Sequence, residues 1–534
     1  MHQRENILVI TLVGILLFFT GCGSTSGLLS SSSEDSSGST TDNVVGGNIS
    51  SVTFSDSQSE ISLSDIAEND SIILLLFTNS SSSSSSAFQV GSSSLNSYLL
   101  DDWEDNNEDE NLTSSFHEIL RNFEADLDES ALLEENDDVN QSLLKYAAKG
   151  SEKSFKVLNS FSSSSSYDTV TATLRYQTAN FNFYVDNRNS SDLDDSDLEE
   201  LAEQFNDIIP AEQELFGEES DINSDGRFTV LFTQTVNELG AAAGGMVTGF
   251  FYAADLFDTS SYPISNEMEI FYTFVPDNSG DYGSAVSKSF AMTNIYPGVL
   301  PHEYQHMISF NQHYNINDST VETSWLNEAL SHLAEDIHSI NSNTYMTTTG
   351  LENPARVRGY LTDISSTCFS CGSSLYQRGG SYLFIRYLYE QAELGNFSNL
   401  ADGADLIGKL LDTSLTSKTN IINAVYGEEG SDDQFKDLIG LFGLAVYLSN
   451  TSMTSDNRFG FQGINLRATQ DDNRGTILNG PAIQEISDFP FTDTITGSGI
   501  HYMQISGADI IKNGFKFDVT TSSASDFGGY VIQE

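Results

Sequence analysis

The spacing of hydrophobic residues changes period along the chain, and these changes predict a mixed α+β protein. Residues 72–77 are all apolar, which is typical of a buried strand, and residues 87–90 are expected to pair with it across a serine tract. Residues 191–209 instead repeat apolar side chains with helical spacing. Further strands are expected at residues 169–176, 179–185, 227–232 and 267–274.

The N-terminal pattern is that of an exported protein. Residues 7–19 form an apolar run too short to span a bilayer comfortably, and small residues around Cys22 follow it. This pattern predicts a signal peptide over residues 1–21. The ending Phe19-Thr20-Gly21-Cys22 resembles a bacterial lipobox, which implies that Cys22 is lipidated and anchors the protein to a membrane at the cell surface or in the periplasm. Ordinary signal cleavage near the same point is the alternative.

Composition divides the rest of the chain into segments. Serine and glycine dominate residues 22–51, which predicts a flexible tether, and residues 101–166 are acidic with a helical or linker character. The acidic segment is a spacer, a pro-region or an inhibitory helix, and the sequence leaves these alternatives open. The expected folded parts are a small β unit at 52–100, a main domain at 167–455 and a C-terminal β-rich domain at 456–534.

Net charge and cysteine content restrict the partners and the covalent chemistry. The chain has 534 residues, of which 77 are acidic and 22 basic, giving a formal charge of −55. Because like charges repel, nucleic acid and anionic lipid surfaces are excluded as partners, and the N-terminal lipid is the expected membrane contact. Cys368 and Cys371 predict a local disulfide in a loop, in preference to a redox motif or a zinc ribbon.

The motif His-Glu-x-x-His at residues 302–306 is the strongest chemical signal in the chain. Residues four apart share one face of a helix, so His302 and His306 can hold one zinc ion between them. Glu303 is next to the first histidine, where its carboxylate can take a proton from a metal-bound water. The alternative is a pair of surface histidines that happen to be four residues apart.

Catalytic zinc needs a third protein ligand, and the sequence offers one on a following helix. His313 is excluded because a helix would place it about 10 Å from His306. Helical spacing returns after Ser324, a suitable N-cap, and Glu328 lies one turn into this helix, just off its apolar stripe. Glu328 is therefore the candidate third ligand, and an ion pair with His332 on its own helix is the alternative.

These motifs resemble those of a known enzyme class. His302-Glu303-x-x-His306 followed by Asn327-Glu328 looks like the gluzincin pattern of thermolysin-like enzymes, and residues 175–450 resemble the hyicolysin-type metallopeptidases of bacteria. The resemblance implies a zincin-like metallopeptidase domain, with a small sheet, an active-site helix and a helical lower half. It also implies His302, His306 and Glu328 as zinc ligands, Glu303 as general base, and a protein or peptide substrate.

The sequence departs from the thermolysin-like pattern at two positions. His332 stands where those enzymes have an aspartate that orients a zinc-bound imidazole, so Glu335 or Asp336 is expected to serve instead. Pro301 precedes the motif, and because proline disrupts a helix interior, the active-site helix is expected to start or kink there.

The sequence also predicts two sites outside the zinc motif. Asp221, Asn223 and Asp225 precede Gly226 with the spacing of half a calcium loop, which predicts a partial calcium site completed by Glu218 or Glu219, or else an acidic turn. The hydrogen-bond donors for an oxyanion are left open between three residues of a later helix: Tyr376, Arg378 and Tyr382.

The function predicted from the sequence is that of an exported, lipid-anchored zinc endopeptidase. The alternative from another class is a surface-binding adhesin lipoprotein on the same scaffold, with zinc structural or absent. A glycan or lipid hydrolase with the same metal site also stays open, because no residue defines the substrate groove.

Overall fold

The computed structural model describes residues 44–46, 48–55, 57–80, 82–91, 116–133, 147–336, 352–427, 430–470, 472 and 474–534. The chain divides into two units, Met1–Asp42 and Asn43–Glu534, and only residues of the second are described. The predicted signal peptide, Cys22 and most of the predicted tether lie outside the described residues. Within the described part of the chain, no helix is long and apolar enough to cross a membrane.

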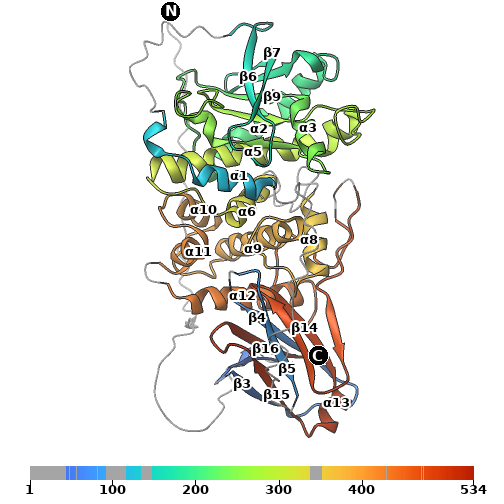
Figure 1. Cartoon of the computed structure of the whole chain (residues 1–534). Coiled ribbons are helices and arrows are strands. Elements are labelled where there is room, and N and C mark those ends of the chain that lie inside the picture. Colours follow the sequence, from blue (N-terminus) through green and yellow to red (C-terminus); the bar gives the residue numbers. More distant parts are fainter. Residues whose placement is uncertain are drawn as a thin grey trace, which may run out of the picture. The chain divides into compact units, whose positions relative to one another are not determined.

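One mixed sheet carries the elements that lead to the candidate site (Figure 1). Its strand order is β10-β11-β9-β8-β7-β6, in which β8, β9 and β11 are parallel and β10 is antiparallel to β11. The residues of β8, β9 and β11 are all buried, as expected for parallel strands covered on both faces. The bounds are β6 Glu152–Leu158, β7 Tyr167–Gln177, β8 Phe181–Asp186, β9 Phe228–Phe232, β10 Gly249–Phe251 and β11 Ile270–Thr273. The sheet thus begins at β6, before the predicted domain start at residue 167.

Two long helices pack against this sheet through aromatic side chains. α2 (Asp195–Phe216) starts with a capping box, in which Asp194 and Asp197 each accept from the other's backbone N–H. Tyr304 of α5 (Tyr296–Phe310) stacks on Phe228 of β9 at a ring distance of 4.6 Å and meets Phe205 of α2 edge-on. These contacts fix α5 on the sheet. Shorter helices of this part are α1 Phe116–Ala125, α3 Gln234–Ala242 and α4 Lys288–Phe290.

α5 begins five residues before Pro301, so the helix does not start at Pro301, and the other expectation, a kink at this residue, stays a prediction. Pro301 lies inside the helix, and a π-helical turn, Ala291–Ile295, leads into it. A second π-helical turn, Asn311–Ile316, follows the helix. The irregular backbone of this segment thus lies at both ends of α5.

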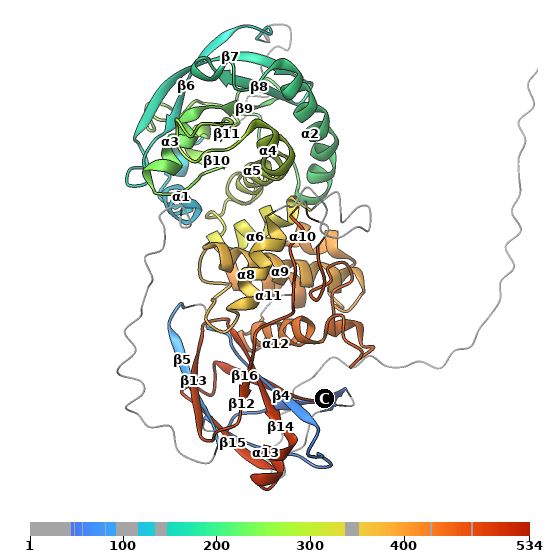
Figure 2. The ribbon, with the colours of Figure 1, turned by 90° about the vertical axis from the view of Figure 1, so that its right-hand side faces the viewer.

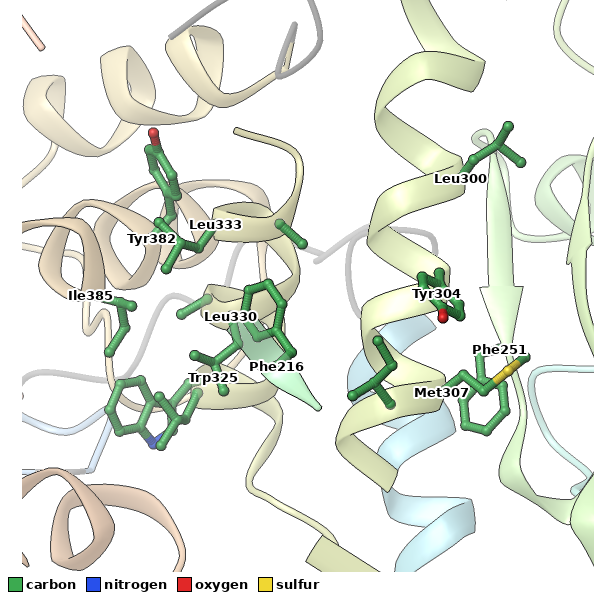
Figure 3. Packing of buried hydrophobic residues seen from close by; sticks show 14 of the residues in the cluster. Phe216, Phe251, Leu300, Tyr304, Met307, Trp325, Leu330, Leu333, Tyr382 and Ile385 are labelled. Carbon is green, nitrogen blue, oxygen red and sulfur yellow. The ribbon is translucent and has the colours of Figure 1, made fainter. Parts of the chain in front are cut away.

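The chain after α5 forms a helical layer. Its helices are α6 Ser324–Ala334, α8 Asn353–Thr362, α9 Leu375–Glu393, α10 Gly403–Leu411, α11 Ser417–Tyr426 and α12 Asp432–Leu448. Leu330 and Leu333 of α6 point toward Ile385 and Tyr382 of α9, whereas Leu300 and Met307 of α5 point toward the strand that carries Phe251 (Figure 3). The apolar faces of α5 and α6 therefore point away from each other, which leaves their polar residues facing.

Strands from both ends of the described chain form a β unit of two sheets (Figures 1 and 2). The sheet orders are β1-β2-β16-β4-β14-β12 and β13-β5-β15-β3. The segments predicted as a small β unit and a C-terminal β domain therefore share both sheets. The bounds are β1 Val44–Gly46, β2 Ile49–Val52, β3 Gln58–Ser62, β4 Ser71–Thr78, β5 Ser85–Val90, β12 Ile483–Ile486, β13 Phe491–Thr496, β14 Ile500–Ser506, α13 Gly507–Lys512, β15 Lys516–Thr521 and β16 Phe527–Gln533.

The expected pairing of residues 72–77 with residues 87–90 is wrong. β4 pairs with β14 and β16, and β5 pairs with β13 and β15 in the other sheet. The physical reason is that β4 is apolar on both faces. Ile72, Leu74 and Leu76 join the core between the two sheets, whereas Ile73, Leu75 and Phe77 join the core on the side of the helices. β4 therefore needs cover on both sides and takes a central place in its sheet.

Candidate metal centre

α5 and α6 bring the three predicted ligands together. His302 and His306 lie on α5 and Glu328 on α6, and all three side chains are buried. The Nε2 atoms of His302 and His306 are 3.2 Å apart. The carboxylate oxygens of Glu328 lie 3.5 Å from His302 Nε2 and 3.4 Å from His306 Nε2. The two imidazoles and the carboxylate, which meets each imidazole through a different oxygen, thus form a triangle of three ligand groups around one space.

This triangle has the size that zinc requires. Tetrahedral zinc with bonds of about 2.1 Å places its ligand atoms about 3.4 Å apart, close to all three measured separations. Both carboxylate oxygens of Glu328 are buried and make no hydrogen bond of good geometry among the described residues, although His117 Nδ1 and Arg378 Nη1 lie 3.1 and 3.3 Å from them. A buried acceptor without a hydrogen bond is costly, and a cation at the centre of the triangle would satisfy it. The donor set therefore fits a zinc ion.

The outer nitrogen of each histidine is held by a partner from α6 or its C-terminal end. His302 Nδ1 lies 2.9 Å from Glu335 Oε1, and the same oxygen lies 2.6 Å from His332 Nδ1. His306 Nδ1 contacts Asn327 Oδ1 and lies 2.9 Å from Ser331 Oγ. Such partners orient ligating imidazoles. Of the two acids predicted for this role, Glu335 occupies it.

Asp336 is engaged elsewhere. It accepts a hydrogen bond from Tyr382 Oη and lies 3.5 Å from Arg386 Nη1. The contact of Asn327 with His306 was not predicted, because the sequence used Asn327 only as part of the Asn-Glu pattern that marks the third ligand. His332 does not pair with Glu328, as the alternative interpretation expected; it contacts Glu335.

We expect Glu335→Ala to lower the affinity for zinc by about 10–100-fold, the usual effect of removing a partner that orients a ligand. The substitution frees the Nδ1 atoms of His302 and His332 while leaving every donor of the triangle in place. Competition with a chromogenic chelator measures the affinity. Glu214→Ala, at an exposed position of α2, is the matched control. An unchanged affinity in Glu335→Ala would contradict an orienting role.

Glu303 is buried next to the triangle and tied to the sheet. Its Oε2 accepts a hydrogen bond of 2.9 Å from Phe251 N of the edge strand β10. Burial raises the pKa of Glu303 to about 7. Glu328 behaves oppositely, because Arg378 and the imidazoles of His117 and His306 hold its pKa well below the usual value despite burial. The pKa values of these two neighbouring glutamates are thus shifted in opposite directions.

A glycine lets β10 approach this carboxylate. A Cβ at Gly249 would lie 2.7 Å from Val299 Cγ1 and 3.3 Å from Glu303 Cγ. The side chains of α5 therefore leave no room for a larger residue at this point of the strand.

The structure adds a fourth group that the sequence did not predict. His117 of α1 lies with its Nδ1 3.1 Å from Glu328 Oε1, and its ring is edge-on to that of His302 and tilted against that of His306, at centroid distances of 5.8 and 6.1 Å. One ligand atom from each of His117, His302, His306 and Glu328 lies within 4.8 Å of the others. His117 belongs to no sequence motif. It lies in the acidic segment 101–166, for which a spacer, a pro-region and an inhibitory helix all stayed open.

A cavity of about 270 Å³ opens beside these groups. Its lining includes Phe116, His117, His302, Glu303, Arg356 and Arg378. Of the three candidate oxyanion donors, Arg378 reaches the site, with Nη1 3.3 Å from Glu328 Oε2. Tyr382 is directed to Asp336, and Tyr376 is 49% exposed and is not among the lining residues.

Two predictions outside this centre have different outcomes. The disulfide Cys368–Cys371 is present, as predicted. The calcium site stays a prediction: Asp221 and Asn223 both accept hydrogen bonds from the backbone N–H of Asp225, and Asp225 accepts one from Arg227 N. Glu219, proposed to complete the site, accepts hydrogen bonds from Tyr304 and Gln213.

The fold is α+β, and its buried His–His–Glu triangle next to Glu303 defines a candidate zinc centre of the kind used by metallopeptidases. No protein-family model matches the sequence. The chain is similar to the neutral metalloprotease ShpI of Staphylococcus hyicus, with 29% identity over 245 residues. The aligned region covers 43% of this chain and 49% of the relative, so the chain spans about half the length of the curated protein it matches. The chain is thus a distant homologue of a metallopeptidase.

Proposed function

We propose that this protein is a zinc-dependent endopeptidase, exported and lipid-anchored through Cys22. The single observation that carries the catalytic part is the triangle of His302, His306 and Glu328 with the buried carboxylate of Glu303 beside it. Similarity to a neutral metalloprotease supports the same activity class. The lipid anchor rests on the N-terminal sequence pattern alone.

In the proposed mechanism, His302, His306 and Glu328 hold the metal while Glu303 moves a proton. Zinc, when bound, supplies a Lewis acid that polarises the scissile carbonyl and lowers the pKa of water. Glu303 accepts the proton of the attacking water on its carboxylate and passes it to the leaving amine. The hydrogen bond from Phe251 N holds that carboxylate in place.

Other groups are suited to bind the substrate. β10 lies at the edge of its sheet, and an extended peptide can add to such an edge through backbone hydrogen bonds. Arg378 lines the cavity and offers N–H donors for charge that develops on the carbonyl oxygen. A protein or peptide substrate therefore fits the proposed site.

The experiment is metal analysis combined with a protease assay on the chain from Ser24 and on its His117→Ala variant. We expect one zinc per chain and cleavage of an unfolded protein such as casein, which a chelator abolishes and added zinc restores. One zinc per chain without cleavage by either protein would refute the peptidase proposal and favour the adhesin alternative.

A further inference from the structure

α1 lies against the proposed catalytic centre through a histidine. His117 is at the second position of this helix, and its side chain is 12% exposed. Its Nδ1 atom is buried and points at the carboxylate of Glu328, whose Oε1 is 3.1 Å away. A buried imidazole nitrogen directed at the three predicted metal ligands is placed as a ligand would be.

The number of ligand groups bears on activity. Catalytic zinc sites have three protein ligands and keep a fourth position for water or substrate, whereas structural sites are closed by four protein ligands. With His117 added, this centre has four protein groups, three imidazoles and one carboxylate. The described arrangement therefore has the four protein ligands of a closed, structural zinc site. It also keeps Glu303, the carboxylate that a catalytic zinc site needs.

The same helix covers the sheet edge that a peptide would use. Phe251 of β10 donates its N–H to Glu303, and its carbonyl oxygen accepts a hydrogen bond of 3.0 Å from Arg121 Nη2. Two residues on, Ala253 N donates to Glu124 Oε1 at 2.9 Å. Ala253 is the first residue of a 3₁₀ turn, Ala253–Leu256, that follows β10. Side chains of α1 thus bind the backbone at the end of β10 and at the start of the turn after it.

Arg121 and Glu124 also stabilise each other. They form a buried ion pair of 2.9 Å between Arg121 Nη1 and Glu124 Oε2, both less than 5% exposed. Phe116, on the same helix, packs against Phe250 of β10 with a ring distance of 5.5 Å. The contact of α1 with β10 is therefore specific in charge and shape.

After α1, the chain continues along the segment that follows β10. Ala131 O accepts a hydrogen bond from Asp258 N, and Leu133 N donates one to Leu256 O. Tyr314 Oη, beyond the end of α5, donates to Leu127 O at 3.3 Å. Residues 116–133 therefore follow the stretch 250–258 over its whole length, from the metal centre outward.

We propose that residues 116–133 are an intramolecular inhibitor, with His117 as the fourth zinc ligand of a latent enzyme. This inference rests on the proposed function. Activation requires that α1 move away from β10. This movement opens the fourth ligand position of the zinc and, at the same time, exposes the edge of the sheet. Of the alternatives left open for the acidic segment, the contacts favour the inhibitory helix.

The first test counts the imidazole ligands and does not depend on activity. X-ray absorption of the zinc-loaded chain from Ser24 is expected to give three imidazoles, falling to two in His117→Ala and staying at three in Asn122→Ala, an exposed position of the same helix. In cobalt-loaded His117→Cys, a thiolate-to-cobalt charge-transfer band is expected. Two imidazoles in the unsubstituted chain would overturn the proposal without any variant.

The second test measures cleavage at equal zinc content. His117→Ala is expected to cleave casein at least about 10-fold faster than the unsubstituted chain, because a larger fraction of molecules is competent. His117→Ala with Arg121→Ala is expected to be faster still, and Asn122→Ala unchanged. A slower His117→Ala would make His117 a catalytic residue and overturn inhibition, as would equal rates. Loss of one imidazole with no cleavage by any protein would instead refute the peptidase function and leave the coordination standing.

Discussion

Replacing Glu303 with glutamine is expected to reduce proteolysis by about 10²–10⁴-fold while zinc binding is kept, because the general base is lost and the ligands are not. The carbonyl oxygen of glutamine can still accept the hydrogen bond from Phe251 N, so β10 keeps its place. The missing property is the ability to accept a proton. Casein cleavage and zinc content are measured on the same preparation.

This comparison is made in two backgrounds, the unsubstituted chain and His117→Ala. In the second background the fourth ligand position is open, so low activity cannot be attributed to α1. If Glu303→Gln cleaved casein at the rate of its parent in both backgrounds, the assignment of Glu303 as general base would be wrong.

Glu328→Gln is expected to have the second large effect, on both zinc and stability. The variant loses the anionic ligand, so its zinc affinity should fall by more than the roughly 10–100-fold expected for a partner that only orients a ligand. Arg378 Nη1 lies 3.3 Å from this carboxylate and is itself buried. Breaking a buried ion pair costs about 3 kcal/mol, which urea denaturation of the metal-free proteins would measure.

Glu322→Gln is the matched control for this variant. Glu322 is buried and accepts hydrogen bonds from Ser417 N and Asn420 Nδ2, away from the metal centre. We expect it to lower stability without changing zinc affinity. Equal zinc affinity in Glu328→Gln and the unsubstituted chain would show that Glu328 is not a ligand.

The sequence predicted the parts of the site that depend on local spacing. His302 and His306 share a helix face because they are four residues apart, and Glu328 was found from the apolar stripe of its own helix. The choice of Glu335 over Asp336 needed the structure, since both lie at the end of α6 and only side-chain direction separates them. The start of α5 at Tyr296 was not predicted, because a proline disrupts a helix interior and the sequence therefore favoured a start or a kink at Pro301.

Pairings between distant segments were the main failure. Residues 72–77 and 87–90 are neighbours in sequence, which favours a hairpin, yet each is paired with strands from the C-terminal end of the chain. Two apolar faces indicate that a strand is covered on both sides. They do not indicate which segments of the chain cover it or pair with it. The partner is decided by the packing of the whole β unit.

By itself, the sequence determined the mixed fold class and the candidate ligand triangle, because periodicity and short motifs act within one element. Only the tertiary structure placed His117 of α1 next to Glu328. It also placed Arg121 against Phe251, which is 130 positions further along the chain. Such contacts depend on burial and hydrogen bonding between elements, which no local pattern encodes. The ligands and the general base of the centre therefore come from α5 and α6. Its proposed inhibition depends on α1, which only the tertiary structure places beside them.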